Sequence, residues 1–411
     1  MMRDLVSLDM FQTAGVGVLA LLLGMLCTRS IPFLKRFCIP APVSGGILIS
    51  LLTLVSYSFL GVEFSFDGTI RDISMMLFFT SVGFQSDIRA IKKGGKPLIV
   101  MIVLVTVLIF SQNLISVGAA KLMRLDPLLG MASGSIPMAG GHGTSGGFSP
   151  LLKSMGLAGA SSITMACATF GLVAGSMIGG PLAELLIRRR RLADESHSED
   201  VVTGLEGSEA SPEAKVERPQ SGEKSFREYS WAVYLLILAM ALGMCLSKLL
   251  ALTGITFPTY FGSLIAACLI RNFTEPFSKG KDALSIDKIV SLGDIALSIF
   301  LGIAMSTLKL WELASLVLPL CVILLSQVVF IALFAYFVAF RALGRDYDSA
   351  VLVSGLCGFG LGATPNAMAN MSAVCFKYRY AVGPFIIVPI IGAMFVDIIN
   401  TTIVTIFLNI I

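Results

Sequence analysis

The chain has 411 residues, of which 55% are hydrophobic and only 14% are charged. Soluble domains carry roughly 25% charged residues, so this composition excludes an ordinary soluble protein and indicates one that is integral to a membrane. The formal net charge of +4 is small, and the basic residues are spread between hydrophobic segments, a distribution that does not suggest nucleic-acid binding.

Ten hydrophobic segments approach or exceed the roughly 20 residues that an α-helix needs to cross a bilayer. We expect spans near 11–28, 42–60, 71–88, 97–121 and 162–187, and near 230–249, 257–271, 289–307, 313–340 and 380–410. No convincing small-residue cleavage site follows the first segment, so we interpret it as a span that is retained rather than a signal peptide. The predicted fold class is an all-α polytopic membrane protein.

One long polar segment, residues 188–229, divides the chain. It opens with four arginines and continues with Glu, Ser, Gly, Pro and Lys, which supply too few apolar residues for a packed core. We predict a flexible linker that joins residues 1–187 to residues 230–411.

The two halves share landmarks in the same order. Asp72 and Asp294 each precede an apolar run, and Asp126 and Asp346 each precede a glycine-rich segment, at offsets of about 220 positions. Five spans per half is an odd number, so the second half must enter the membrane in the opposite orientation. The sequence therefore predicts two inverted-topology repeats.

The distribution of Lys and Arg predicts the orientation, because cytoplasmic loops collect these residues. Clusters such as Lys35 with Arg36, the four arginines at 188–191, and Arg341 with Arg345 then share one side. We expect the linker to be cytoplasmic and both termini to lie outside.

Each half contains a glycine-rich break before its last span. The first is Ala139-Gly-Gly-His-Gly-Thr144 and the second is Gly358-Phe-Gly-Leu-Gly-Ala-Thr-Pro-Asn366. Non-helical backbone at membrane depth is tolerated only where protein buries it or where it lines a cavity, and paired breaks indicate a transporter's binding site. We predict re-entrant hairpins near 128–152 and 350–376. The alternative is a pair of kinks that only permit close helix packing.

The residues after each break are typical of a helix start. We expect Thr144 to cap the half-helix that follows the first break, and Thr364 to be an N-cap with Pro365 at the first helical position. Each helix start would offer free N–H groups and the positive end of a helix dipole to an anion. Asp126, Asp346 and Asp348 are interpreted as helix caps, and Gln112 and Gln327 as polar links between helices.

Three polar residues are candidates for ion or proton binding. His142 suits a proton relay or a substrate contact, or alternatively stabilises the hairpin tip. Asp397 and Asn400 lie in the last span, where an ionisable group is costly, and their oxygens suit a hard cation such as sodium. The alternative for Asp397 is a satisfied structural carboxylate. Neither hairpin carries Lys or Arg near its tip, so a bound anion would depend on helix ends and a co-bound cation.

At these residues the sequence resembles the sodium/glutamate symporter family of bacterial inner membranes. The segments that carry the resemblance are Gly134-Ser135, Ala139-Gly-Gly-His-Gly-Thr144, Met165-Ala-Cys-Ala-Thr-Phe-Gly-Leu172, Gly179-Gly-Pro181, Leu308-Lys-Leu-Trp-Glu-Leu-Ala314, Cys357-Gly-Phe-Gly-Leu-Gly-Ala-Thr-Pro365 and Ala369-Asn370.

The resemblance implies sodium-coupled import of L-glutamate by a homodimer of the elevator type in a lipid bilayer. It implies substrate and sodium binding at the hairpin tips. We expect neither an enzymatic reaction nor an organic cofactor, and the loop charges predict that both termini are periplasmic. The expected substrate-binding residues are Ser135, Gly140, Gly141, His142, Gly143, Thr144, Gly360, Gly362, Ala363, Thr364 and Asn366. The expected sodium ligands are Thr364, Asn370, Asp397 and Asn400.

Three alternatives stay open. A transporter of the same build would carry another organic anion or amino acid, with protons coupled through His142. An ion channel is a different class, although two hairpins that meet from opposite faces would occlude a pore. An intramembrane enzyme is disfavoured because no second carboxylate is evident to pair with Asp397.

Overall fold

The computed structural model describes residues 4–37, 39–87, 90–192, 222–253, 257–274 and 284–411. Residues 193–221, which form most of the predicted linker, lie outside the described residues. In the first half the structure contains β1 (Asp4–Leu8), α1 (Met10–Ser30), α2 (Pro32–Arg36), α3 (Ala41–Val55), a π-helical turn (Ser56–Leu60), β2 (Val62–Phe66), α4 (Thr69–Gln85), α5 (Ala90–Leu122), α6 (Pro127–Ala132), α7 (Ser135–Met138), α8 (Gly141–Ser154) and α9 (Ala160–Arg190).

The second half is helical throughout its described part. It contains α11 (Gly222–Ala251), α12 (Phe261–Thr274), α13 (Ile286–Ser306), a 3-10 helix (Leu310–Leu316), α14 (Val317–Phe334), a π-helical turn (Ala335–Ala339), α15 (Phe340–Leu343), α16 (Tyr347–Gly360), α17 (Thr364–Lys377), α18 (Val382–Ile390), a second π-helical turn (Ile391–Phe395) and α19 (Val396–Leu408).

Eight helices in the described part of the chain are long and apolar enough to cross a membrane. They are Met10–Ser30, Ala41–Leu60, Gly95–Leu122, Ala160–Arg190, Ser225–Ala251, Ile286–Ser306, Val317–Leu343 and Val382–Leu408. The spans predicted at 71–88 and 257–271 are shorter helices, α4 with 17 residues and α12 with 14. Pro258 stands before α12 and outside it, so that helix begins later than predicted and ends at Thr274, beyond the predicted bound. The structure is thus that of a helical, multi-spanning membrane protein.

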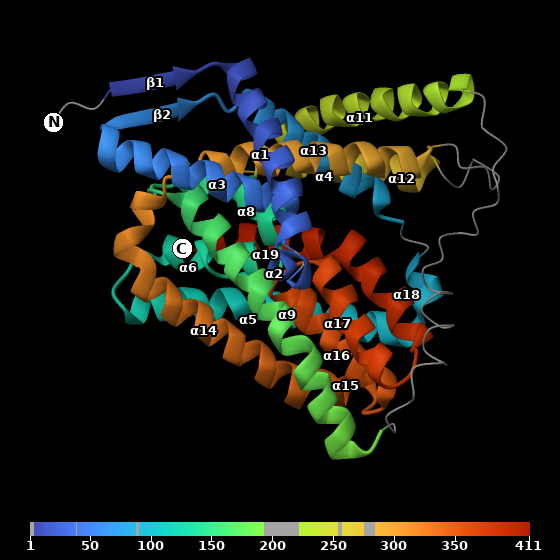
Figure 1. Ribbon diagram of the computed structural model, residues 1–411. Coiled ribbons are helices and arrows are strands. Elements are labelled where there is room, and N and C mark those ends of the chain that lie inside the picture. The colour runs from blue at the N-terminus through green and yellow to red at the C-terminus, as the bar shows by residue number, and fades with distance from the viewer. Residues whose placement is uncertain (1–3, 38, 88–89, 193–221, 254–256, 275–283) are drawn as a thin grey trace.

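The helices form two groups (Figure 1). The first, here the α4–α13 group, consists of α1, α3, α4, α11, α12 and α13. The second, here the hairpin group, consists of α5, α6, α7, α8, α9, α14, α16, α17, α18 and α19. Each group takes helices from both halves of the chain, so neither half is a separate compact body.

Apolar side chains are buried inside both groups. Leu108, Ile331 and Leu356 belong to a large buried cluster whose members lie mainly in the hairpin group. A smaller cluster that includes Phe84 and Leu236 joins α4, α11, α12 and α13. Many large apolar side chains on the outside of both groups remain exposed, as expected where helices face lipid.

Helices α1 and α3 cross where both carry glycine. A Cβ at Gly24 would overlap the carbonyl of Ala41 in α3, and a Cβ at Gly45 would overlap the carbonyl of Ala20 in α1. Small residues of this kind let two backbones approach closely in a membrane, where packing rather than hydrophobicity holds helices together. Next to the crossing, the Ser50 hydroxyl donates to the Met305 carbonyl and ties α3 to α13.

We expect Gly24→Val to lower the stability of the folded protein by about 1–3 kcal/mol, because the added side chain forces the two backbones apart. Thermal unfolding of the purified protein in detergent measures this effect. Gly15→Val is the matched control, since Gly15 lies on the same helix with nothing within 4 Å of a Cβ. An equal shift in both variants would contradict the crossing as the cause.

Candidate binding site at the two helix breaks

The first predicted hairpin consists of three helices, α6, α7 and α8. Gly141 begins α8 with a φ of +60°, a conformation that glycine adopts without strain. Gly140 precedes it and provides no side-chain cap, so the prediction that Thr144 caps this helix was wrong. Because the helix starts four residues earlier than predicted, Thr144 lies inside α8, where its hydroxyl can reach a neighbouring helix.

The second break separates α16 from α17. Ala363 is the N-cap, with an extended backbone and no side-chain hydrogen bond, so Thr364 is the first helical residue and Pro365 the second. The predicted cap was therefore wrong by one position. Proline tolerates either place, because N–H groups of the first turn have no intrahelical partner.

The two breaks lie against each other. A Cβ at Gly141 would lie 2.9 Å from the carbonyl oxygen of Gly362. The glycines at 140–143 and 358–362 thus bring two interrupted stretches of backbone together, as the paired breaks predict. Gln112 of α5 lies beside them, and its side-chain amide donates to the Gly360 carbonyl at 2.7 Å.

The first break is bonded to α19, the last helix of the other half. The Ser135 hydroxyl donates to the Asn400 side-chain oxygen at 2.6 Å, and the Asn400 amide donates back to the Ser135 carbonyl at 3.1 Å. The Thr144 hydroxyl donates to an Asp397 carboxylate oxygen at 3.3 Å. Ser135 and Asn400 are fully buried, so this pair satisfies polar groups that water cannot reach.

The second break is bonded to α9, the last helix of the first half. The Asn366 amide donates to the Leu172 carbonyl at 2.7 Å. One turn later, the Asn370 amide donates to the Gly175 carbonyl at 3.0 Å and to the Ser354 carbonyl at 3.3 Å. The Asn366 side-chain oxygen is buried and has no hydrogen-bond partner among the described residues, so it can accept a donor or a cation.

The four predicted sodium ligands lie on two helices and do not all meet one neighbour. Asp397 and Asn400 face the first break from α19, while Asn370 on α17 contacts α9. Thr364 packs against Gly392, in the π-helical turn that precedes α19. Pro389 removes a backbone donor just before that turn, and the last span, predicted at 380–410, runs from Val382 to Leu408 with this π-helical turn inside it.

No group of three His, Cys, Asp or Glu side chains gathers in the part of the chain that the structure describes. A cation at the breaks would therefore be held by one carboxylate together with amide, hydroxyl and backbone carbonyl oxygens. That ligand set suits an alkali cation better than zinc, which takes thiolate and imidazole.

His142 contacts α9. Its Nε2 lies 3.0 Å from the Thr169 hydroxyl, which itself donates to the Met165 carbonyl at 2.9 Å. Because a hydroxyl has a single hydrogen, this geometry requires Nε2 of His142 to be the donor. The histidine is buried, so in this structure it holds the first break against the last helix of the same half.

Predictions for the residues around the breaks had mixed outcomes. Asp126 and Asp346 accept the first-turn N–H groups of α6 and α16 at 2.8 Å and are helix caps, as predicted. Asp348 lies within the first turn of α16 and caps nothing, so that interpretation was wrong. The Gln327 amide donates to the Gln112 carbonyl at 2.8 Å, which confirms a polar link between α14 and α5.

Two residues that contact the first break or α19 were not predicted from the sequence. Asn113 accepts the Ser135 N–H at 3.0 Å, and Tyr260 places its hydroxyl 3.3 Å from that of Thr401 in α19. Tyr260 also stacks on Phe79, with ring centroids 3.7 Å apart. The glycines of α8 are the signal that could have found such contacts, because rings of the α4–α13 group lie over Gly143, Gly146 and Gly147.

Residues 6–380 match the sequence pattern of the protein family described as sodium/glutamate symporter. This protein belongs to the sodium/glutamate symporter family. The symporter of Escherichia coli (strain K12) is 38% identical over 409 residues, which covers 98% of both chains. The symporter of Haemophilus influenzae (strain ATCC 51907 / DSM 11121 / KW20 / Rd) is 36% identical over 392 residues, or 95% of both.

Among solved structures, the chain is similar to a sodium proton antiporter from Methanocaldococcus jannaschii, with a TM-score of 0.45 and 16% identity over 98% of both chains.

In this member of the sodium/glutamate symporter family, we expect Asn400→Ala to lower folded-state stability by about 1–3 kcal/mol, because the buried Ser135 loses both of its bonds to α19. Thermal unfolding in detergent measures the loss. Thr402→Ala is the control, since Thr402 is exposed and bonds only within its own helix. A double mutant with Ser135→Ala that loses the full sum of the two single losses would contradict direct coupling.

Proposed function

We propose that the protein is a sodium-coupled symporter that imports L-glutamate by alternating access. The observation that carries this proposal is the meeting of two broken segments, each bonded to the last helix of the other half. Family membership supports the substrate and the coupling ion, because the relatives above are named for sodium and glutamate.

Substrate binding is proposed at the two helix starts, α8 and α17. Their first-turn N–H groups and the residues from Ser135 to Thr144 and from Gly360 to Asn366 would receive the glutamate carboxylates. Neither stretch contains Lys or Arg. The negative charge of the two glutamate carboxylates would therefore be neutralised in part by sodium. The sodium ion would be held by oxygens of Thr364, Asn370, Asp397 and Asn400. Coupling then follows from electrostatics, since the anion binds well only with the cation.

Transport is proposed to move the hairpin group relative to the α4–α13 group, in the manner of an elevator. Two cavities at the edge of the hairpin group support this motion. One, of about 420 Å³, lies among β2, α4, α8 and α9, and the other, of about 850 Å³, lies between α2 and the helices α9 and α17 and reaches Asn370. In the orientation predicted from the loop charges, the first opens to the periplasm and the second to the cytoplasm.

The architecture is proposed to be two inverted repeats, residues 1–187 and 230–411, with five spans each and re-entrant hairpins at 128–152 and 350–376. The linker would be cytoplasmic and both termini periplasmic, in a bacterial inner membrane, with two copies in a homodimer. The crossed bonding of each break to the other half's last helix is the arrangement that such a repeat would produce.

The first test is uptake of radiolabelled L-glutamate into proteoliposomes that contain the purified protein. We expect accumulation above the equilibrium level when an inward sodium gradient is imposed at fixed pH and clamped voltage. Accumulation driven equally by a proton gradient would favour the second candidate, a proton-coupled carrier that uses His142. Flux without accumulation, at rates far above those of carriers, would favour a channel.

A second test addresses the ion site. We expect Asp397→Asn to raise the sodium concentration for half-maximal uptake by about tenfold or more, since removal of the charged ligand costs about 1.4 kcal/mol of sodium binding for each factor of ten. Asp287→Asn, at an exposed position in the first turn of α13, is the control. Unchanged sodium activation in Asp397→Asn would remove Asp397 from the proposed ligands.

A further inference from the structure

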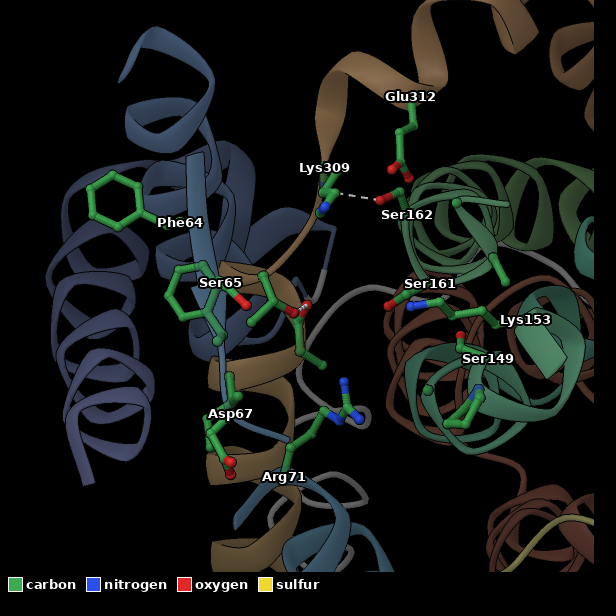
Figure 2. A pocket seen from close by; sticks show the side chains of 18 of the residues that line it. Phe64, Ser65, Asp67, Arg71, Ser149, Lys153, Ser161, Ser162, Lys309 and Glu312 are labelled. Carbon is green, nitrogen blue, oxygen red and sulfur yellow. Dashed lines mark hydrogen bonds between the residues drawn. The ribbon is translucent and has the colours of Figure 1, made fainter. Parts of the chain in front are cut away.

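The cavity of about 420 Å³ between the two helix groups is lined by charged side chains that the proposed binding site at the breaks does not use. Figure 2 shows it from close by, with β2 and α13 on one side and α8 and α9 on the other. Its volume falls within the range of small-molecule sites, which run from roughly 300 to 1,000 Å³. We call it the Arg71–Lys153 cavity.

Two cations reach this space from opposite helix groups. Arg71 lies in the first turn of α4 and Lys153 in the last turn of α8, and in Figure 2 both charged ends point into the gap. Lys153 is exposed and has no ion-pair partner among the described residues. Arg71 contacts Asp72 through Nε at 2.9 Å and one terminal nitrogen at 2.8 Å, which leaves its other terminal nitrogen for a ligand.

The other charges that line the cavity are engaged or lie at its far end. Lys309 forms an ion pair with Glu63 at 2.6 Å. Asp67 accepts the Thr69 N–H at 2.8 Å. Glu312 lies at the opposite end of Figure 2 from Arg71, next to Gly159. Arg71 is paired with Asp72 but keeps one terminal nitrogen for a ligand, and Lys153 has no ion-pair partner among the described residues.

An aromatic ring separates this cavity from the helix break. Phe300 of α13 is fully buried, lines the cavity and lies directly over Gly146 of α8. Gly146 is five residues beyond Gly141, which corresponds to about 8 Å along a helix. Lys153 is twelve residues beyond Gly141, about 18 Å or a little over three turns along the helix. A molecule held between Arg71 and Lys153 would thus lie on the far side of the Phe300 ring from the first break.

We propose that the Arg71–Lys153 cavity is an outer waiting site for acidic amino acids, in which one carboxylate contacts Arg71 and the other contacts Lys153. The inference rests on the proposed function for the identity of the ligand. Two cations on opposite walls favour a molecule with two carboxylates over a neutral amino acid, and they raise its local concentration before it passes Phe300.

The first experiment measures initial rates of L-glutamate uptake at fixed sodium, with ionic strength set by choline chloride. We expect Lys153→Gln to raise KM by about threefold to tenfold at low ionic strength with kcat unchanged, and the difference to shrink in high salt, where charges are screened. Lys153→Arg retains the charge and should keep the KM of the parent protein. Lys121→Gln is the matched control, an exposed lysine that does not line the cavity.

A KM for Lys153→Gln that equals the parent value at low ionic strength would overturn the inference, as would an equal rise in Lys121→Gln. A second measurement does not depend on transport. We expect glutarate, but not neutral glutaramide, to slow acetylation of Lys153 by a water-soluble N-hydroxysuccinimide ester, followed by mass spectrometry, and to leave Lys121 unaffected. Protection without glutamate uptake would refute the proposed function alone, whereas uptake without protection or a KM effect would refute the waiting site.

Discussion

Polar backbone that leaves a helix inside a hydrophobic protein must find partners, and this constraint organises the molecule. Near the first break the Asn400 amide of α19 donates to the Ser135 carbonyl, and at the second break the side-chain amides of Asn366 and Asn370 donate to backbone carbonyls of α9. Each unsatisfied group would cost several kcal/mol in hydrocarbon. The two halves are therefore joined where their chains are least regular.

The same constraint explains why the helices sort into two groups. The breaks and their partners form the hairpin group, which is held together internally by buried hydrogen bonds and a large apolar cluster. The α4–α13 group meets it largely through rings that lie over the glycines of α8. Apart from the hydrogen bond between the hydroxyls of Tyr260 and Thr401, these contacts of flat rings with glycine are apolar, so this boundary resists sliding less than the hydrogen-bonded interior of the hairpin group.

Sequence patterns predicted the long spans and the breaks because composition and glycine content determine both. The bounds of the two short helices were shifted in prediction, since hydropathy does not register that α12 begins only after Pro258. Asn400 could be named as a candidate functional residue from the sequence, because a polar residue inside a membrane span is costly and therefore stands out. Its partner, Ser135, lies 265 positions away, and no local pattern specifies that bond. The caps were misplaced because backbone geometry at Gly141 and Ala363, not the nearby threonines, starts each helix.

The separation between Ser135 and Asn400 also bears on how the protein is made. A ribosome adds about 5–20 residues per second, so the 265 positions between them take roughly 13 to 53 seconds to synthesise. During that interval the first break has left the ribosome without the amide that completes it. The insertion machinery or a water-filled space must shelter this segment until α19 arrives, and a chain truncated before its last helix would leave the break unsatisfied and open to quality-control proteolysis.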